Sequence, residues 1–273
     1  MTIITSYYLY WSYTQLNQLG IGMDEPPPGS PVKAWPDETL LEKFNTYFEV
    51  DTALTAGQIE AAQRIRYQVY CVENPFENSS DHPDGLERDE FDSHSVHSLL
   101  IHRASKQAMG TTRLILPVRG ALNRSFAIQQ ACDHPTLKRL PLHRTAEVSR
   151  FSISKHFRRR NNDTLYEGRD APGGQRSAAP LMSLGLLQSA VRMSADYGIT
   201  HLCAMMEPTL LRLLSAVSIR FERLGPLVKH HGMRQPCYCE VAPLLRQVEK
   251  EQRPVWEILT DGGTLIRRPL LAA

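Results

Sequence analysis

Arginine and carboxylate side chains recur beside apolar segments of this sequence. Arg66 lies in a segment with a helical pattern, and three acids come soon after it: Glu87, Asp89 and Asp92. A charge buried without a partner is very costly, so a buried arginine requires carboxylates around it. We therefore expect Arg66 to pair with two or more of these acids in one polar site. Ordinary salt bridges on a solvated surface, which stabilise a protein little, are the alternative interpretation.

A second group of charges accompanies two predicted strands. Arg113 lies in one strand, and Glu147 and Arg150 lie at the beginning of the next. Residues three apart on a strand point to opposite faces unless a β-bulge intervenes. A bulge would re-aim Arg150 and free a backbone N–H, the donor that acyl transfer uses to stabilise a developing oxyanion. A partly buried Glu147 could then act as a general base through a water. The alternative interpretation is a salt bridge on an edge strand, which needs neither a bulge nor a buried Glu147.

Four side chains near the first group are of metal-ligating type: Asp89, Asp92, His94 and His97. On an extended segment Asp92 and His94 share one face, while His97 points to the other. A metal site needs ligands that converge, so we expect none here. Nucleophilic chemistry has little support either. No Gly-x-Ser-x-Gly motif occurs, and Cys71 lies within the helical pattern, where a buried thiol is the common case.

Composition places the chain among soluble globular proteins that can bury a sizeable core. It has 273 residues, of which 42% are hydrophobic and 22% charged, and a formal net charge of +2. This nearly neutral charge argues against nucleic acid as a partner. No apolar run approaches the ~20 residues of a membrane helix. The five scattered cysteines predict reduced thiols in a cytoplasmic protein.

Hydrophobic periodicity predicts one mixed α/β domain over residues 37–250. Helices are expected after Thr55, from Pro180 and from Pro208. The expected strands, of which the second and third form a hairpin, lie at 47–51, 98–102, 112–116, 148–153, 200–206, 224–229 and 238–241. Residues 1–36 are expected to form an aromatic tail with a Pro-rich linker, and residues 251–273 a C-terminal extension.

In this order the segments resemble the N-acyl-homoserine-lactone (autoinducer) synthases and the long-chain N-acyl amino acid synthases. The likeness is greatest to the acyltransferases associated with bacterial PEP-CTERM/exosortase systems. It spans roughly Phe44 to Glu240. The motifs that carry it are Arg66-x-x-Val-Tyr70, Asp89-x-x-Asp92, Arg113-Leu, Glu147-x-Ser-Arg-Phe151, Glu207-Pro, Leu224-Gly-Pro and His231-Gly-Met-Arg-Gln-Pro236. Each motif is weak alone, but their common order is specific.

The resemblance implies an α/β (α+β) fold of the GNAT type, with a central mixed, mostly antiparallel sheet flanked by helices. A splayed strand pair of this fold exposes backbone groups to the pantetheine arm of an acyl donor. The implied reaction is attack of an amine on a thioester, with Glu147 removing the proton and a backbone N–H near Phe151 or Ser152 holding the oxyanion. The ion-pair network that shapes the acceptor side would comprise Arg66, Asp89, Asp92, Arg113 and Arg150.

The resemblance also implies how substrates are held. Phe76 would wall the acyl or pantetheine channel, and Tyr70 and Glu87 would lie beside the substrate. The donor would be the acyl-phosphopantetheine of acyl-carrier protein, with no permanently bound cofactor, and the acceptor would be an amino acid or another small amine. We further expect a monomer.

Two features of the sequence favour a carrier protein over acyl-CoA as the donor. Acetyl-CoA users of this fold carry a glycine-rich loop whose amides cradle a pyrophosphate, and Gly173–Ala179 does not fit that loop cleanly. The basic run Lys155–Arg160 could be a solvated turn or a general anion patch. It could also place three arginines against an acidic carrier surface: Arg158, Arg159 and Arg160. Two other functions stay open: a non-catalytic module that binds an acyl ligand, and lactone synthesis from S-adenosylmethionine.

Overall fold

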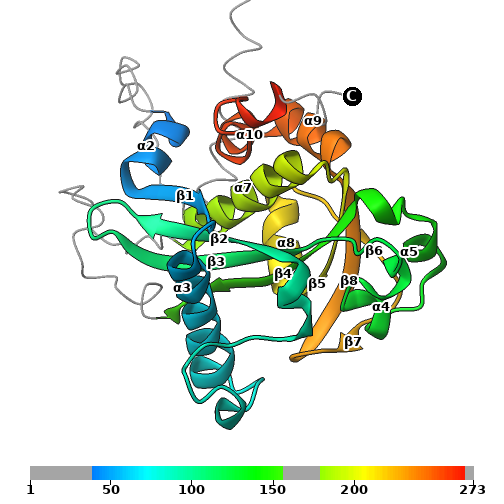
Figure 1. Ribbon diagram of the computed structural model, residues 1–273. Helices are drawn as coiled ribbons and strands as arrows, with labels where there is room; N and C mark the ends of the chain where they lie inside the picture. The colour runs from blue at the N-terminus through cyan, green and yellow to red at the C-terminus, as the bar shows by residue number, and fades with distance from the viewer. Residues whose placement is uncertain (1–38, 156–178, 268–273) are drawn as a thin grey trace, which may run out of the picture.

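The computed structural model describes residues 39–155 and 179–267. An open, mostly antiparallel sheet with helices on both faces organises these residues (Figure 1). Along its main path the sheet contains β1 (Phe48–Thr52), β2 (Ser95–His102), β3 (Gln107–Ile115), β4 (Thr145–Ile153), β5 (His201–Met206), β8 (Met233–Glu240) and β6 (Glu222–Arg223). The short strand β7 (Val228–Lys229) pairs with β8. Only β4 and β5 run parallel among these pairs, so the predicted mixed sheet is confirmed.

One face of the sheet is covered by α7 (Ala179–Tyr197) and α8 (Pro208–Ala216). Pro180 lies in the first turn of α7, and Gly198 follows the helix with a φ of +68° that favours glycine. A further layer packs over α7 and consists of α2 (Leu40–Tyr47), α9 (Val241–Glu251) and α10 (Arg253–Thr260) (Figure 1). Because α7 lies between two layers, it is buried almost all round.

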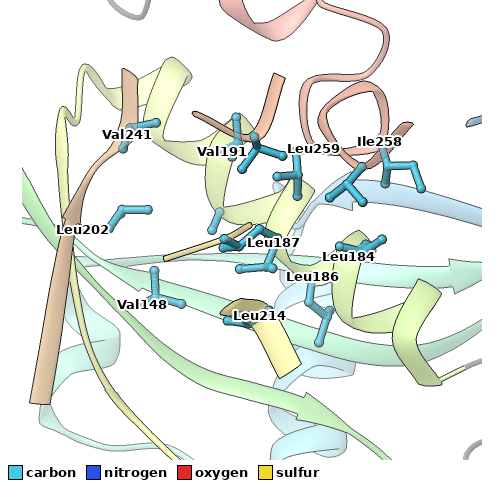
Figure 2. Packing of buried hydrophobic residues seen from close by; sticks show 14 of the residues in the cluster. Val148, Leu184, Leu186, Leu187, Val191, Leu202, Leu214, Val241, Ile258 and Leu259 are labelled. Atoms are coloured by element: carbon cyan, nitrogen blue, oxygen red, sulfur yellow. The ribbon is translucent and has the colours of Figure 1, made fainter. Parts of the chain in front are cut away.

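The main core forms around α7. Figure 2 shows Leu184 and Leu187 of α7 packed among side chains from β4, β5, α8 and α10, including Val148, Leu202, Leu214, Ile258 and Leu259. The predicted C-terminal extension therefore includes α10, a helix whose apolar residues belong to this core. The chain continues from α10 to the 3-10 helix η6 (Leu265–Arg267).

The opposite face of the sheet carries α3 (Ala56–Tyr67), which crosses in front of the strands in Figure 1. Its start is fixed by a capping box, in which Thr55 Oγ1 accepts from the Gln58 N–H and the Gln58 side chain accepts from the Thr55 N–H. The expected α-helix does not continue unchanged, because residues Gln68–Glu73 form a π-helix, η1. The 3-10 helices η2 (Ser79–Asp81) and η3 (Glu90–His94) follow.

An insertion of residues 116–144 separates β3 from β4. It contains η4 (Leu122–Arg124), α4 (Ile128–Ala131), α5 (Pro135–Arg139) and η5 (Leu142–Arg144), for which periodicity gave no prediction. Its apolar residues form a second, smaller core on the α3 side of the sheet, with members that include Phe91, Ile115, Phe126, Ile128, Leu137 and Cys203.

Of the other predictions about the fold, one is confirmed and one is wrong. The expected hairpin is confirmed, since β2 and β3 pair antiparallel. The single strand expected at 224–229 is wrong, because this stretch holds only the two-residue β7, preceded by a turn with Gly225 at a φ of +74°. All five cysteines are free. Among the described residues, no helix has the length and apolar character needed to cross a membrane.

Candidate active site

A cavity of about 380 Å³ lies where β4 and β5 separate. The two strands pair only from Thr145–Val148 to His201–Ala204, although both continue beyond that point. The unpaired ends, Ser149–Ile153 and Met205–Met206, line the cavity. Parallel strands that diverge in this way leave backbone groups without a neighbouring strand, so a ligand can reach them.

The cavity has one apolar wall and one polar wall. The apolar wall belongs to the main core and includes Phe151, Leu187, Met206, Leu210 and Leu214. The polar wall is contributed by η1, the segment after it, β4 and the β7–β8 hairpin, and it includes Tyr70, Asn74, Arg150, His230, His231 and Arg234. A ligand with a long apolar chain and a polar end would match this division.

Glu147 lines the cavity from the paired part of β4 and is 1% exposed. It shares a sheet face with its cross-strand partner Ile115, a member of the second core. Its Oε2 accepts a hydrogen bond from the Ile128 N–H at 2.9 Å. Burial raises the pKa of Glu147 to about 7, although the N–H groups of Ile128 and Ala127 and the charge of Arg113 oppose the shift. Such a carboxyl can accept a proton near neutral pH.

A β-bulge lies beside Glu147, as one of the two interpretations of the sequence requires. Thr111 pairs with Ser152 and Arg113 with Ser149, so Arg150 and Phe151 oppose the single residue Thr112. Arg150 has a φ of +48°, in the left-handed region that non-glycine residues adopt only when the surroundings hold them there. The bulge places the Arg150 guanidinium on the same face as Arg113.

The side chain of Arg150 is held by carboxylates and by an aromatic ring. Its Nη2 donates to Glu87 Oε1 at 2.8 Å, to Asp89 Oδ2 at 3.1 Å and to Glu77 Oε1 at 3.3 Å. Its Nε also faces Glu87, and the guanidinium carbon lies 4.7 Å from the centre of the Tyr70 ring. Burial disfavours the charged guanidinium, but the hydrogen bonds and charge of Glu87 outweigh it and raise the pKa of Arg150.

Arg66 is buried completely and is paired on both edges of its guanidinium. Its Nε donates to Glu87, and its Nη1 and Nη2 donate to the two oxygens of Asp92 at 2.5 and 2.9 Å. Arg113 makes the equivalent fork to Asp89, at 2.5 and 2.8 Å, and its Nε donates to Ser149 Oγ at 2.9 Å. Bidentate pairs of this kind fix orientation as well as charge.

Two carboxylates of this network, Glu87 and Asp92, are held in their ionised form. Burial opposes ionisation of Glu87, but hydrogen bonds and charge from Arg150 and Arg66 outweigh it and lower its pKa to about 2. The pKa of Asp92 is lowered as well, because the hydrogen bonds of Arg66 and His97 exceed the effect of burial. His97 Nε2 lies 3.3 Å from Asp92 Oδ1, and burial lowers the pKa of His97, so its ring is neutral.

Aromatic rings meet at the mouth of the cavity. The ring centres of Tyr70 and Phe76 lie 5.7 and 6.0 Å from that of His231, which stands at the tip of the β7–β8 hairpin. In Figure 1 the C-terminal end of α3 and the strand β7 both lie toward the bottom of the view. His231 Nε2 contacts Glu77 Oε1 at 2.8 Å, yet burial and the charges of Arg150 and Arg234 lower its pKa to about 4. The neutral ring therefore donates this hydrogen bond.

The structure brings most of the predicted residues together. Arg66, Arg113 and Arg150 form one ion-pair network with three predicted acids: Glu87, Asp89 and Asp92. Surface salt bridges are thus the wrong interpretation for this group, since the three arginines are at most 7% exposed. Glu147 and four further predicted residues line the cavity: Tyr70, Phe76, Phe151 and Ser152.

The remaining predictions about the site concern the basic run and the possible metal ligands. Arg158, Arg159 and Arg160 lie outside the described residues. Of the four possible metal ligands, Asp89 and Asp92 contact guanidinium groups instead. Over residues 39–155 and 179–267, no three or more His, Cys, Asp or Glu side chains converge on a possible metal position.

Sequence reasoning missed several residues of the site. Glu77, His230 and Arg234 were not singled out, and neither were the Ala127 and Ile128 N–H groups that face Glu147. One signal was present for the histidines, because His230-His231-Gly232 lies where two strands must turn. No local signal could have shown that an insertion reaches Glu147.

Comparison with known proteins places this arrangement in a fold family. Residues 65–166 match the family described as Acetyltransferase (GNAT) domain. The crystal structure of TofI in a ternary complex with an inhibitor and MTA is similar at 19% identity and a TM-score of 0.51, covering 74% of this chain and 96% of that one. The fold is that of the GNAT acetyltransferase domain.

Other solved structures with this GNAT fold are less similar in their coordinates. FeeM, an N-acyl amino acid synthase from uncultured soil microbes, has 16% identity and a TM-score of 0.45, over 73% of this chain and 93% of that one. BjaI, a CoA-dependent acyl-homoserine lactone synthase with SAM and isopentyl-CoA, has 18% identity and a TM-score of 0.47, over 79% and 88%. No curated protein matches the chain.

Proposed function

We propose that this protein is an N-acyltransferase that moves a long-chain fatty acyl group from acyl-carrier protein to the amine of an amino acid or a related small amine. One observation carries the proposal. A fully buried carboxyl, Glu147, has a pKa near 7 and lines the cavity of a GNAT fold beside a bulge that interrupts the β3–β4 ladder. This places a proton acceptor next to the backbone groups that would meet a thioester.

The reaction divides between these groups. The amine nitrogen attacks the thioester carbonyl carbon, a C–N bond forms and the C–S bond breaks. Glu147 takes a proton from the attacking nitrogen, and the leaving sulfur takes up a proton as it departs as a thiol. Backbone N–H groups at the bulge, near Phe151 or Ser152, would stabilise the negative charge that develops on the carbonyl oxygen.

The ion-pair network would shape the acceptor side of the cavity. Within the described residues, the hydrogen bonds of Arg150 use its Nε and Nη2, and none uses its Nη1. Because Arg150 lines the cavity, this donor is available for the carboxylate of an amino acid. The acids behind Arg150 hold it in place, so the guanidinium is positioned before the acceptor arrives.

The apolar wall would hold the acyl chain. Phe151, Leu187, Leu210 and Leu214 offer only hydrocarbon surface to a ligand, which suits a fatty chain. The choice of a carrier protein over acyl-CoA as the donor, and an association with an exosortase system, stay predictions that rest on motif resemblance.

The test is acyl transfer by the purified protein. Long-chain acyl-carrier protein and the matching acyl-CoA are each offered with a panel of amino acids and simple amines, and amide formation is followed by mass spectrometry. We expect product from the carrier-protein donor, and a loss of about 10²–10⁴-fold in kcat for Glu147→Gln. Glu49→Gln replaces a half-buried carboxylate on β1, which pairs with Arg103 and Lys106 away from the cavity, and is the matched control.

Three results would contradict the proposal. Product formation by Glu147→Gln at the wild-type rate would show that Glu147 is not the general base. A folded protein that retains lipid but acylates none of the amines is a binding module instead. Lactone formation on addition of S-adenosylmethionine, without amide product from any amino acid, assigns the chain to lactone synthesis.

A further inference from the structure

The insertion between β3 and β4 contributes no described residue to the lining of the cavity, yet it contacts Glu147 directly. The Ile128 N–H donates to Glu147 Oε2 at 2.9 Å, and the Ala127 N–H also faces this carboxyl and lowers its pKa. The insertion therefore approaches Glu147 from the side away from the cavity. A buried carboxyl that lacked these donors would be oriented only by packing.

The two N–H groups lie in a tight turn. The Gln129 N–H donates to Phe126 O at 3.2 Å, which closes the turn, and Ala127 has φ −62° and ψ −35°, the values of the second residue of a type I turn. The Gln129 side chain holds the start of the turn and ties it to the segment before it. Its Oε1 accepts from the Phe126 N–H at 3.0 Å and its Nε2 donates to Leu122 O at 3.0 Å.

The turn is anchored to the rest of the protein in two ways. Phe126 and Ile128 are fully buried in the second core. His94, at the end of η3, places its Nε2 3.0 Å from Ser125 O, immediately before the turn. Because Asp89 caps the start of η3 and its carboxylate pairs with Arg113, the same short helix connects the turn to the ion-pair network.

We propose that the turn Phe126–Gln129 is a positioning element for catalysis: it fixes the orientation of the Glu147 carboxyl and determines how readily that carboxyl gives up its proton. The inference rests on the proposed role of Glu147 as general base. Burial favours the protonated carboxyl, and hydrogen bonds to its ionised form counter that effect. The turn thus keeps the base usable near neutral pH.

The other titratable groups around Glu147 do not change their charge in this range. Arg113 on β3 and Arg150 on β4 remain charged guanidinium groups. Burial raises the pKa of Cys203 on β5, and it raises the pKa of Cys237 on β8 to about 12, so both thiols stay neutral. On the insertion, the groups that face Glu147 are backbone amides. Among these groups, Glu147 is the one that titrates near neutrality.

The decisive variant is Ala127→Pro. Proline suits the second position of a type I turn and the observed φ of Ala127, but it removes the N–H that faces Glu147. We expect the acid limb of the kcat/KM profile to move to higher pH by about one unit. This shift corresponds to the free energy of about one hydrogen bond to a charged group. Activity at pH 6 should then fall about tenfold, with little change at pH 9. Ala127→Gly keeps the N–H and should keep the limb in place.

A second variant covers the case in which Ala127→Pro does not fold. Gln129→Ala removes the side chain that holds the turn and should move the limb in the same direction by a smaller amount. Gln130→Ala, the exposed neighbouring residue, is its control and should not move the limb. The pH dependence of unfolding supplies a readout without substrate, because the pH at which Glu147 ionises in the folded protein should shift with the activity limb.

The outcomes separate this inference from the proposed function. If Glu147→Gln abolishes activity while folded Ala127→Pro and Gln129→Ala keep the wild-type limb, the turn has no role in tuning the base and the inference is overturned. If Glu147→Gln remains active, the general-base assignment fails first. A purely structural role for the turn would lower stability without moving either pH readout.

Discussion

Replacing Glu147 by glutamine should make the protein more stable at alkaline pH while it loses activity. The pKa of Glu147 is raised from its ordinary value of 4.5 to about 7, so the folded protein holds this proton more tightly than the unfolded chain does. Stability associated with the neutral form is therefore complete below about pH 4.5 and is lost as the pH rises through 7. The glutamine side chain does not ionise and avoids this loss.

The size of the effect follows from the shift. About 2.5 pKa units at 1.36 kcal/mol each gives about 3 kcal/mol between pH 4.5 and pH 8. Glutamine can keep the Ile128 hydrogen bond through its Oε1, but its amide N–H₂ needs a new acceptor in a buried place. The absolute stability of Glu147→Gln at low pH can therefore differ from wild type, and the quantity to compare is the change with pH.

The assay is urea unfolding of wild type and Glu147→Gln at pH 5, 6, 7 and 8. The free energy of unfolding of the variant, relative to wild type, should rise by about 3 kcal/mol across this series, with equal m-values. Glu49→Gln, in which the replaced carboxylate is 40% exposed, should run parallel to wild type. Parallel curves for Glu147→Gln as well would mean that Glu147 ionises normally, and the assignment of a base poised near neutrality would be refuted.

Three other substitutions test separate parts of the structure. Glu87→Gln should lower the free energy of unfolding by about 3–5 kcal/mol at pH 7, and by much less near pH 2, where wild-type Glu87 becomes protonated; unfolding at both pH values checks this. Ser152→Ala should leave stability unchanged or raise it by about 1 kcal/mol in thermal unfolding, because Ser152 Oγ is buried without a hydrogen-bond partner. Leu210→Phe should favour shorter acyl chains by about tenfold or more in kcat/KM measured with donors of graded length, whereas Leu54→Phe, on the surface, should not.

The sequence allowed much of the scaffold to be predicted, because the relevant signals are local. The capping box at Thr55 and the prolines at the starts of α7 and α8 fix helix ends within a few residues. The spacing of Glu147 and Arg150 left two interpretations open, a β-bulge and an edge-strand salt bridge, and the structure contains the bulge. The insertion of residues 116–144 was missed because its helices are too short to show a period, and tertiary packing holds them.

The chemistry of the site depends on information that the sequence does not carry locally. Glu87 and Glu147 are both about 1% exposed, yet the pKa of one is about 2 and that of the other about 7. Neither side chain is exposed to solvent, but Glu147 lies deeper in the protein, and the partners of the two carboxyls differ. Glu87 receives two guanidinium groups, whereas Glu147 receives backbone N–H groups of the insertion and the more distant charges of Arg113 and Arg150. One carboxyl is thereby fixed as a permanent charge and the other is left able to exchange a proton near neutral pH.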